Sequence, residues 1–253
     1  MLKVEGLIKD YGKVRAVNDI TFTAKPGEIY GFLGHNGAGK STTIKVSSGL
    51  LKPTQGQVSI CGYDIVKEPI EAKKNLGYVP ETPFLYDKLT GAEFLELIYG
   101  VYQPETTAIE RQNRVKEMLE EIELVEKGQD LIGSYSQGMR RKIALCSGFI
   151  HNPKVVLLDE PTIGLDASSA KVAKDLFRKH ADEGNTLLLT THIMEIAEKL
   201  CDRIGIISQG KIIIEGTIEA LKESAKGHNC ESLEDLFLYF TQKDQETNGG
   251  DSE

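Results

Sequence analysis

The sequence predicts an α/β fold with a mostly parallel sheet as its core, an antiparallel β region near the start and a helical insert in the middle. Three observations predict it. After residue 153, short apolar runs alternate with amphipathic stretches, as in a parallel sheet covered on both faces. A glycine-rich loop follows an apolar run that ends near residue 33. From about residue 84 to 150, the strand pattern gives way to helical periodicity.

The first 33 residues carry the pattern of strands and turns. Apolar and polar side chains alternate through Ile20, Phe22 and Ala24, which indicates a strand with one buried face. A turn is predicted at Pro26-Gly27, followed by a buried strand from Ile29 to Leu33. These elements lead directly into the glycine-rich loop.

The middle of the chain is predicted to be mainly helical. A helix over residues 40–51 and a strand over 57–61 come first, and helices over 91–102 and 105–124 follow. The last of these has an apolar face formed by Val115, Met118, Leu119 and Ile122. Its glutamates lie on the opposite face, where we expect them to be solvated.

Strands and helices alternate again in the last part of the chain. We predict strands over 155–158, 186–190 and 204–207, helices over 168–180 and 194–200, and a hairpin arm over 210–216. Residues 1–220 then form a single domain, with the helical subdomain at about 84–150, and residues 221–240 form a C-terminal helical extension. The polar residues 241–253 are expected to be disordered.

Composition excludes several classes of protein. The net charge of −8 argues against general nucleic-acid binding, so no nucleic-acid partner is expected. A local basic group at Arg140, Arg141 and Lys142 is expected on a solvated helix face. We see no signal peptide, and the apolar runs are far shorter than the ~20 residues of a membrane helix. The chain is not expected to cross a membrane by itself.

The loop GHNGAGKS, residues 34–41, matches the phosphate-binding pattern G-x-x-x-x-G-K-[ST]. Glycines allow backbone N–H groups to curl around a phosphate, and the following helix N-terminus adds partial positive charge. Lys40 can reach the β- and γ-phosphates, and the Ser41 hydroxyl can ligate Mg²⁺. The predicted strand before the loop and helix after it are the context that this motif requires.

Two acids end the predicted strand VVLLDEP, residues 155–161. Asp159 would lie at the carboxyl end of a parallel strand, where ligands of open α/β sheets bind, and can hold Mg²⁺. Glu160 can orient and deprotonate an attacking water. A simple polar turn would explain one acid but not two acids followed by a proline.

These motifs and the segment SYSQGMRRK, residues 134–142, resemble the nucleotide-binding subunit of ABC transporters over nearly all of residues 1–220. The segment resembles the family signature LSGGQ. Ser136 and Gly138 match, whereas Gln137 and Met139 depart from the pattern. Ser136 is also a good N-cap, so the helix after it would present its N–H groups to an anion.

Other positions follow from the resemblance. Asp166 matches the D-loop, His192 the switch histidine that contacts the γ-phosphate, and Tyr11 the aromatic residue that stacks on adenine. Glu81 stands where the family has the Q-loop glutamine, which touches Mg²⁺ and the membrane partner. This glutamate, the altered signature and the segment 231–241 resemble the subgroup of exporters with separate membrane subunits.

The resemblance therefore implies an ABC ATPase fold that binds ATP and Mg²⁺. The implied catalytic residues are Lys40, Glu160 and His192, and the implied metal ligands are Ser41, Glu81 and Asp159. The implied nucleotide-binding residues are Tyr11, Gly34, His35, Asn36, Gly37, Ala38, Gly39, Lys40, Ser41, Thr42, Ser136 and Gly138.

The implied partners are a second copy or a paralogous subunit in a head-to-tail dimer, and a multi-spanning membrane subunit. The chain would be cytoplasmic, at the inner face of the cell membrane. An alternative is a soluble ABC ATPase that acts on a protein scaffold, which the catalytic motifs do not exclude. A small-molecule P-loop kinase would need neither signature nor switch histidine. Cargo, transport direction and homodimer versus heterodimer stay open.

Overall fold

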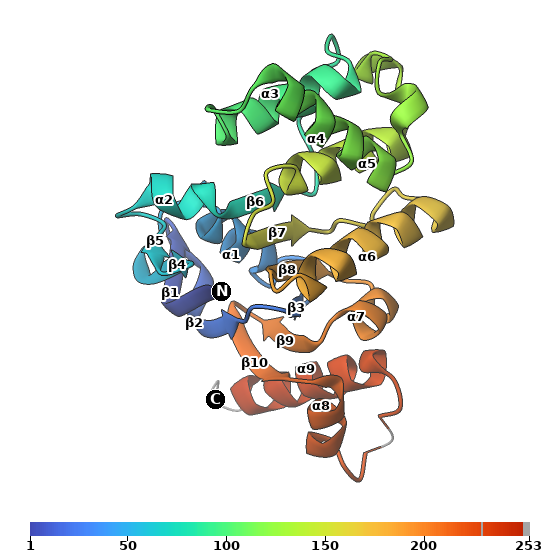
Figure 1. Ribbon diagram of the computed structural model, residues 1–253. Coiled ribbons are helices and arrows are strands. Elements are labelled where there is room, and N and C mark those ends of the chain that lie inside the picture. Colours follow the sequence, from blue (N-terminus) through green and yellow to red (C-terminus); the bar gives the residue numbers. More distant parts are fainter. Residues whose placement is uncertain (229, 250–253) are drawn as a thin grey trace.

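The computed structural model describes residues 1–228 and 230–249 (Figure 1). Its centre is a six-stranded sheet in the order β10-β9-β3-β8-β7-β6. Five neighbouring strands run parallel, and β10 pairs antiparallel with β9, which confirms the predicted parallel core and the hairpin arm. The strands are β3 (Ile29–Leu33), β6 (Leu76–Val79), β7 (Val155–Asp159), β8 (Thr186–Thr191), β9 (Arg203–Ser208) and β10 (Lys211–Gly216).

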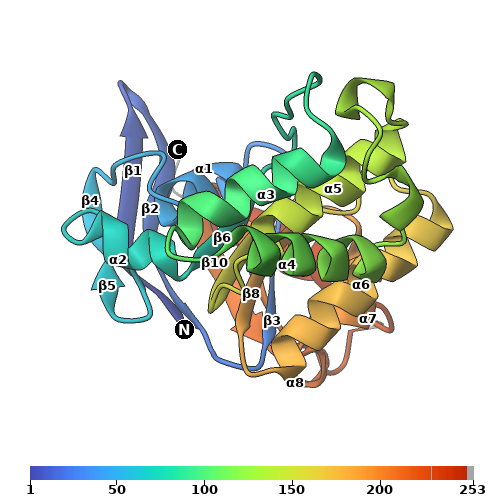
Figure 2. The ribbon, with the colours of Figure 1, turned by 45° about the horizontal axis from the view of Figure 1, so that its top comes forward.

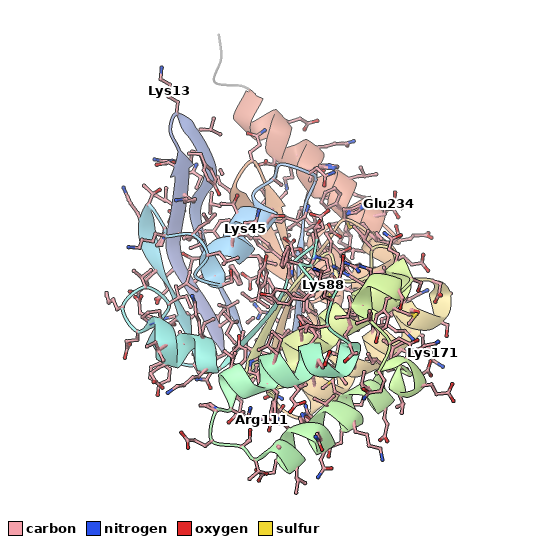
Figure 3. The ribbon with its side chains drawn as sticks, turned by 90° about the horizontal axis from the view of Figure 1, so that it is seen from above. Lys13, Lys45, Lys88, Arg111, Lys171 and Glu234 are labelled. Atoms are coloured by element: carbon pink, nitrogen blue, oxygen red, sulfur yellow. The ribbon has the colours of Figure 1, made fainter. Side chains whose placement is uncertain are left out.

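A second, antiparallel sheet confirms the predicted β region at the start of the chain. Its order is β2-β1-β4-β5, and β1 and β2 form a long hairpin with Lys13 projecting from its tip (Figure 3). The strands are β1 (Leu2–Tyr11), β2 (Val14–Ala24), β4 (Gln55–Ile60) and β5 (Tyr63–Asp64).

Helices cover the sheets, and three of them form the helical insert. Figure 2 shows α3 and α4 lying over α5, apart from the antiparallel sheet. Capping boxes at Thr90 and Thr107 fix the starts of α3 and α4. The helices are α1 (Lys40–Ser47), α2 (Pro69–Lys74), α3 (Gly91–Tyr102), α4 (Ala108–Glu121), the 3₁₀ turns η1 (Val125–Lys127) and η2 (Ile132–Ser134), α5 (Gln137–Phe149), α6 (Ala167–Asp182), α7 (Met194–Leu200), α8 (Ile218–Ser224) and α9 (Leu233–Gly249).

The central strands read as continuous apolar runs because each of their faces is buried in a different core. In β3, Ile29 and Leu33 belong to the core shared with α5, α6 and α7, whereas Tyr30 and Phe32 belong to the core shared with the antiparallel sheet. Every residue of β3 is buried. Burial of both faces is the usual reason why strands of a parallel sheet show no alternation.

Several predicted boundaries need correction. The helix predicted over residues 40–51 ends at Ser47, and the helix predicted over 105–124 runs from Ala108 to Glu121. Residues 241–249 are helical instead of disordered, because α9 continues to Gly249 and buries Thr241. The rest of the expected tail, residues 250–253, lies outside the described residues. Within the described part of the chain, no helix is long and apolar enough to span a membrane.

A buried histidine joins the helical insert to the sheet. The His151 ring stacks on Tyr102 at the end of α3, with 3.6 Å between ring centroids, and its Nε2 lies 3.1 Å from the Leu76 carbonyl oxygen in β6. Donation of that hydrogen bond requires the proton on Nε2, and Nδ1 is buried without a partner. Burial lowers the pKa of His151 to about 4.

This geometry predicts a loss of stability in mild acid. The pKa of His151 is about 4 in the folded chain against an ordinary 6.5, so the unfolded chain takes up the proton first. The contribution of neutral His151 to the free energy of unfolding is therefore complete above pH 6.5. It declines as the pH falls toward 4, by at most about 1.4 kcal/mol per pH unit. Urea unfolding between pH 7.5 and 5 measures it. His151→Gln should flatten the pH dependence, and the exposed His228→Gln serves as the control. An unchanged slope in His151→Gln would contradict the prediction.

Candidate functional site

The phosphate-binding loop connects the end of β3 to the start of α1, as predicted. Its backbone requires glycine at two positions, because φ is 82° at Gly37 and 110° at Gly39. A Cβ atom on Gly39 would also lie 2.6 Å from the Ala16 carbonyl oxygen. The loop is therefore packed tightly against the β1–β2 hairpin, which holds its N–H groups in place.

Lys40 is buried at the first position of α1, with its ammonium group inside the loop. The Nζ atom donates hydrogen bonds to the carbonyl oxygens of Gly34, at 2.5 Å, and His35, at 3.1 Å. Burial lowers the pKa of Lys40, and the carboxylates of Glu160, Asp159 and Glu81 oppose that shift. The lysine is thus a cation enclosed by a loop shaped for phosphate and surrounded by acids.

Asp159 ends β7 beside the loop and is almost fully buried. Its Oδ1 accepts a hydrogen bond of 2.6 Å from the Thr190 hydroxyl in β8, and the Ser41 hydroxyl lies 3.4 Å from the same oxygen. Carboxylate and hydroxyl oxygens are the hard donors that Mg²⁺ prefers, so these residues fit the ion. Nowhere in residues 1–228 and 230–249 do three His, Cys, Asp or Glu side chains form a metal cluster.

Glu160 and His192 form a hydrogen-bonded pair at the ends of neighbouring strands. His192 Nδ1 lies 2.8 Å from Glu160 Oε1. Glu160 is buried, its Oε2 has no partner, and its φ of 48° is rare for a residue other than glycine. His192 is half-exposed. A buried carboxylate oxygen without a partner, on strained backbone and beside a phosphate loop, is suited to bind a water molecule.

One cleft of about 380 Å³ brings most of the predicted site together. Its lining includes a residue that the sequence did not indicate, Ala16, whose carbonyl oxygen packs against the loop. The lining residues are Ala16, His35, Asn36, Gly37, Gly39, Lys40, Ser41, Thr42, Glu81, Glu160 and His192.

The signature residues Ser136 and Gly138 are not part of the lining of this cleft. Ser136 is the N-cap of α5, as predicted, and its hydroxyl accepts a hydrogen bond of 3.3 Å from the Met139 amide. Gln137 lines a different groove, together with Glu81 and Ile163. One chain therefore does not place its own signature on its own phosphate loop.

Tyr11 is also outside the lining of the cleft, at the end of β1. Its ring is 46 % exposed, and Lys9 Nζ lies 5.4 Å from the ring centroid. The exposed ring is able to stack against a flat group, and a cation over one face is a favourable arrangement for an aromatic ring.

The expectation of a solvated basic face at residues 140–142 is wrong for two of its three members. Arg141 and Lys142 are buried, and only Arg140 keeps a partly exposed side chain, which pairs with Asp87. Helix α5 packs against α3, α6 and β6, so more than one of its faces is covered. The sequence does carry a signal for this burial, because an apolar run, Ile143 to Cys146, continues directly from the basic residues.

Comparison with known proteins agrees with this geometry. The family model described as ABC transporter matches residues 17–163. The chain is 41 % identical over 220 residues to the linearmycin resistance ATP-binding protein LnrL of Bacillus subtilis, covering 86 % of this chain and 69 % of LnrL. It is 36 % identical over 235 residues to the ABC transporter ATP-binding protein NatA of the same organism, covering 91 % of both.

Two solved structures share the fold. One, described as the ATP-binding subunit of an ABC transporter, superimposes with a TM-score of 0.88 at 32 % identity, covering 95 % of this chain and 99 % of that one. Another is a dimeric ATP-binding cassette in a post-hydrolysis state with ADP and Pi bound, with a TM-score of 0.78 at 25 % identity, covering 86 % of this chain and 99 % of that one. The chain therefore belongs to the ABC transporter family, as an ATP-binding and ATP-hydrolysing cassette.

Proposed function

We propose that this chain hydrolyses ATP with Mg²⁺ as one half of a head-to-tail dimer, and that the dimer drives a separate multi-spanning membrane subunit, as an exporter. One observation carries the dimer in this proposal. The cleft holds the phosphate loop, Glu81, Glu160 and His192, whereas the signature residues Ser136 and Gly138 lie elsewhere on the same chain.

The nucleotide is proposed to lie along the loop, with adenine on Tyr11 and the phosphates over residues 34–42. The exposed Tyr11 ring offers a stacking surface. The amides of the loop and the start of α1 face the phosphates, where the helix dipole favours negative charge. Lys40, which bonds to two loop carbonyls, would turn its ammonium group to the β- and γ-phosphates. Four residues of the loop would contribute backbone N–H groups only: Gly34, Gly37, Ala38 and Gly39.

Mg²⁺ is proposed to bind to Ser41 and Asp159, with Glu81, on the wall of the cleft that follows β6, as a further ligand. The Ser41 hydroxyl and the Asp159 carboxylate already lie within 3.4 Å of each other. When bound, the ion would neutralise charge on the β- and γ-phosphates. Glu81 replaces a neutral glutamine of the family, so it adds a negative charge to this wall.

Glu160 is proposed as the general base and His192 as the residue that orients it and senses the γ-phosphate. The hydrogen bond from His192 occupies one carboxylate oxygen, Oε1, and leaves Oε2 for the attacking water. That bond requires the proton on Nδ1, since a carboxylate only accepts. The proton of the water would pass to Glu160 as the oxygen attacks the γ-phosphorus, and the bond from the γ-phosphorus to the β–γ bridging oxygen would break, which gives ADP and inorganic phosphate.

The second half of the site is proposed to come from the signature of the partner subunit. The Ser136 hydroxyl and the amides at the start of α5, including that of Gly138, would close over the γ-phosphate. Helix α5 runs from Gln137 to Phe149, long enough for a substantial dipole at this end. ATP then favours the closed dimer because it contacts two subunits there and one in the open state.

The membrane subunit is proposed to contact the helical insert and the loop from Glu81 to Leu89. Phe84, in this loop, has 82 % of its side chain exposed and packs edge-to-face on Tyr86. Relatives include proteins named for doxorubicin resistance, in Mycobacterium tuberculosis, and for Nod factor export, in Burkholderia lata, which supports export. The chain would act at the cytoplasmic face of the cell membrane, and nucleic acid has no part in this function.

Replacement of the proposed base should separate binding from turnover. We expect Glu160→Gln to lower kcat by about 10²- to 10⁴-fold, the usual contribution of general base catalysis, because an amide accepts no proton at neutral pH. ATP binding should persist, so the variant should elute as a dimer on gel filtration with MgATP. Glu117→Gln, on the exposed face of α4, is the matched control. Full turnover in Glu160→Gln would reject this assignment.

Mixing two inactive variants tests whether the site is shared between subunits. Lys40→Ala damages the loop and Ser136→Ala damages the signature, so a head-to-tail heterodimer of the two has one intact site. A 1:1 mixture should regain up to roughly a quarter of the wild-type ATPase rate, since half of the dimers are mixed and each has one intact site of two. Lys40→Ala mixed with a Lys40→Ala/Ser136→Ala double variant contains no intact site. Lys45→Ala, exposed in the same helix, checks that α1 tolerates substitution. No recovery beyond the control would reject the shared site.

The membrane partner can be identified by affinity purification. The tagged chain would be isolated from detergent-solubilised membranes of its own host, and proteins that accompany it identified by mass spectrometry. We expect a stoichiometric multi-spanning protein, and Phe84→Ser should lower its yield, because it removes the most exposed aromatic residue of the proposed contact. Recovery of soluble partners alone would instead favour an ATPase that acts on a protein scaffold.

A further inference from the structure

Arg141 has a buried side chain in α5 that satisfies every one of its donors with a backbone carbonyl. Its residue exposure is 5 %. An arginine has five N–H donors in a fixed planar fork, and here each has an acceptor. Nε donates to Pro161 at 3.0 Å, one terminal nitrogen to Pro80 at 2.9 Å and Glu81 at 2.8 Å, and the other to Asp159 at 3.2 Å and Glu160 at 2.5 Å.

The five carbonyls belong to two segments that end neighbouring strands. Residues 80–81 follow β6, residues 159–161 end and follow β7, and β6 and β7 pair in parallel. The first segment carries Glu81 and the second carries Asp159 and Glu160. One guanidinium group of α5 therefore forms hydrogen bonds to the backbone of both segments that carry these acids.

The segment held by Arg141 includes the strained residue of the site. Glu160 has a φ of 48°, a conformation that side chains other than glycine rarely adopt and that persists where surrounding contacts fix it. On its amide side, Glu160 N–H donates to Thr190. On its carbonyl side, Glu160 accepts hydrogen bonds from Arg141 at 2.5 Å and from the Ile163 amide at 3.4 Å. The arginine thus supplies the shorter of the two hydrogen bonds that hold the Glu160 carbonyl.

The charge of Arg141 is balanced by the cleft and not by a direct ion pair. Burial lowers its pKa, and the carboxylates of Asp159, Glu81 and Glu160 oppose that shift. Its hydrogen bonds all go to carbonyl oxygens, whose directions are set by the backbone. The planar guanidinium group bonds several carbonyls at once and so fixes their relative positions. A lysine ammonium group at this place would attract the carbonyls without fixing those positions.

We propose that Arg141 is a positioning residue for hydrolysis, because its guanidinium fork holds Glu160 in the strained conformation that presents Oε2 to the attacking water and links that turn to the Glu81 segment. This inference rests on the proposed role of Glu160 as the general base. Arg141 itself is not part of the lining of the cleft.

The test compares ATP affinity with turnover in variants of the full chain. We expect Arg141→Gln and Arg141→Lys to lower kcat by about 100-fold, as expected when a reacting group is displaced by about 1 Å, while the Kd for MgATP changes less than about three-fold. Arg140→Gln, the adjacent arginine that pairs with Asp87 at the surface, should keep a normal kcat. Single-turnover hydrolysis gives the rates, and equilibrium dialysis with ATP gives the affinity.

A double variant then asks whether Arg141 acts through Glu160. In Glu160→Gln, adding Arg141→Gln should reduce the residual rate by less than about three-fold, because effects on one unit are not additive. A full additional loss would show a general structural effect and overturn the proposal. A normal kcat in Arg141→Gln, measured beside an inactive Glu160→Gln, would also overturn it. The same holds if the Arg141 variants lose ATP binding in parallel with turnover, or if both of them fail to fold. Full turnover in Glu160→Gln alone would instead reject the base assignment.

Discussion

The register of the parallel sheet is the constraint on which the site depends. The phosphate loop follows β3, Glu81 follows β6, Asp159 and Glu160 end and follow β7, and His192 follows β8. These strands are neighbours in parallel pairing, so their carboxyl ends lie along one edge. Side chains that are far apart in sequence therefore meet in one cleft. The two cores on either face of the sheet keep this register, because a slip of one residue would move each strand's side chains to the wrong core.

Around that edge, each acid is held differently. Asp159 Oδ1 accepts a hydrogen bond from the Thr190 hydroxyl of β8, and the Ser41 hydroxyl lies 3.4 Å from the same oxygen. Glu160 is held through its backbone in an unfavourable conformation and through one carboxylate oxygen by His192. Glu81 follows the neighbouring strand β6 and lines the cleft, and its carbonyl accepts a hydrogen bond from Arg141. The carboxyl ends of these strands thus combine one carboxylate suited to metal binding with one whose free oxygen is suited to water.

The helical insert separates the signature from the loop within one chain. Helix α5 begins at the signature and then passes between α3, α6 and β6, so its N-terminus is presented outward while its body is buried. A helix N-terminus that faces away from its own phosphate loop makes sense in a dimer, where it can face the loop of another subunit. The same helix carries Arg141 to the back of the cleft. The start of α5 and the backbone of Glu160 are therefore connected through one helix.

The chemistry of the site could be read from sequence, because it depends on residue types at fixed local spacing. The loop at residues 34–41 needs glycine at positive φ and lysine at the helix start, and the acids Asp159 and Glu160 follow a recognisable apolar strand. Alternating strands and helices predicted the parallel sheet for the same reason. Local periodicity also failed in places, as for residues 241–249, where α9 continues as a helix through polar sequence.

The tertiary structure decided what depends on contacts between distant segments. Arg141 looked like part of a solvated basic face, yet its five acceptors come from residues 80–81 and 159–161, which no local pattern places beside it. The partnerless Oε2 of Glu160 and the exclusion of Ser136 from the cleft are likewise properties of the assembled sheet and insert. The sequence by itself determined which side chains are available to the site and which local backbone conformations they require. Their distances, burial and shared partners exist only once the strands are paired, because hydrogen bonds and desolvation are set by neighbours in space.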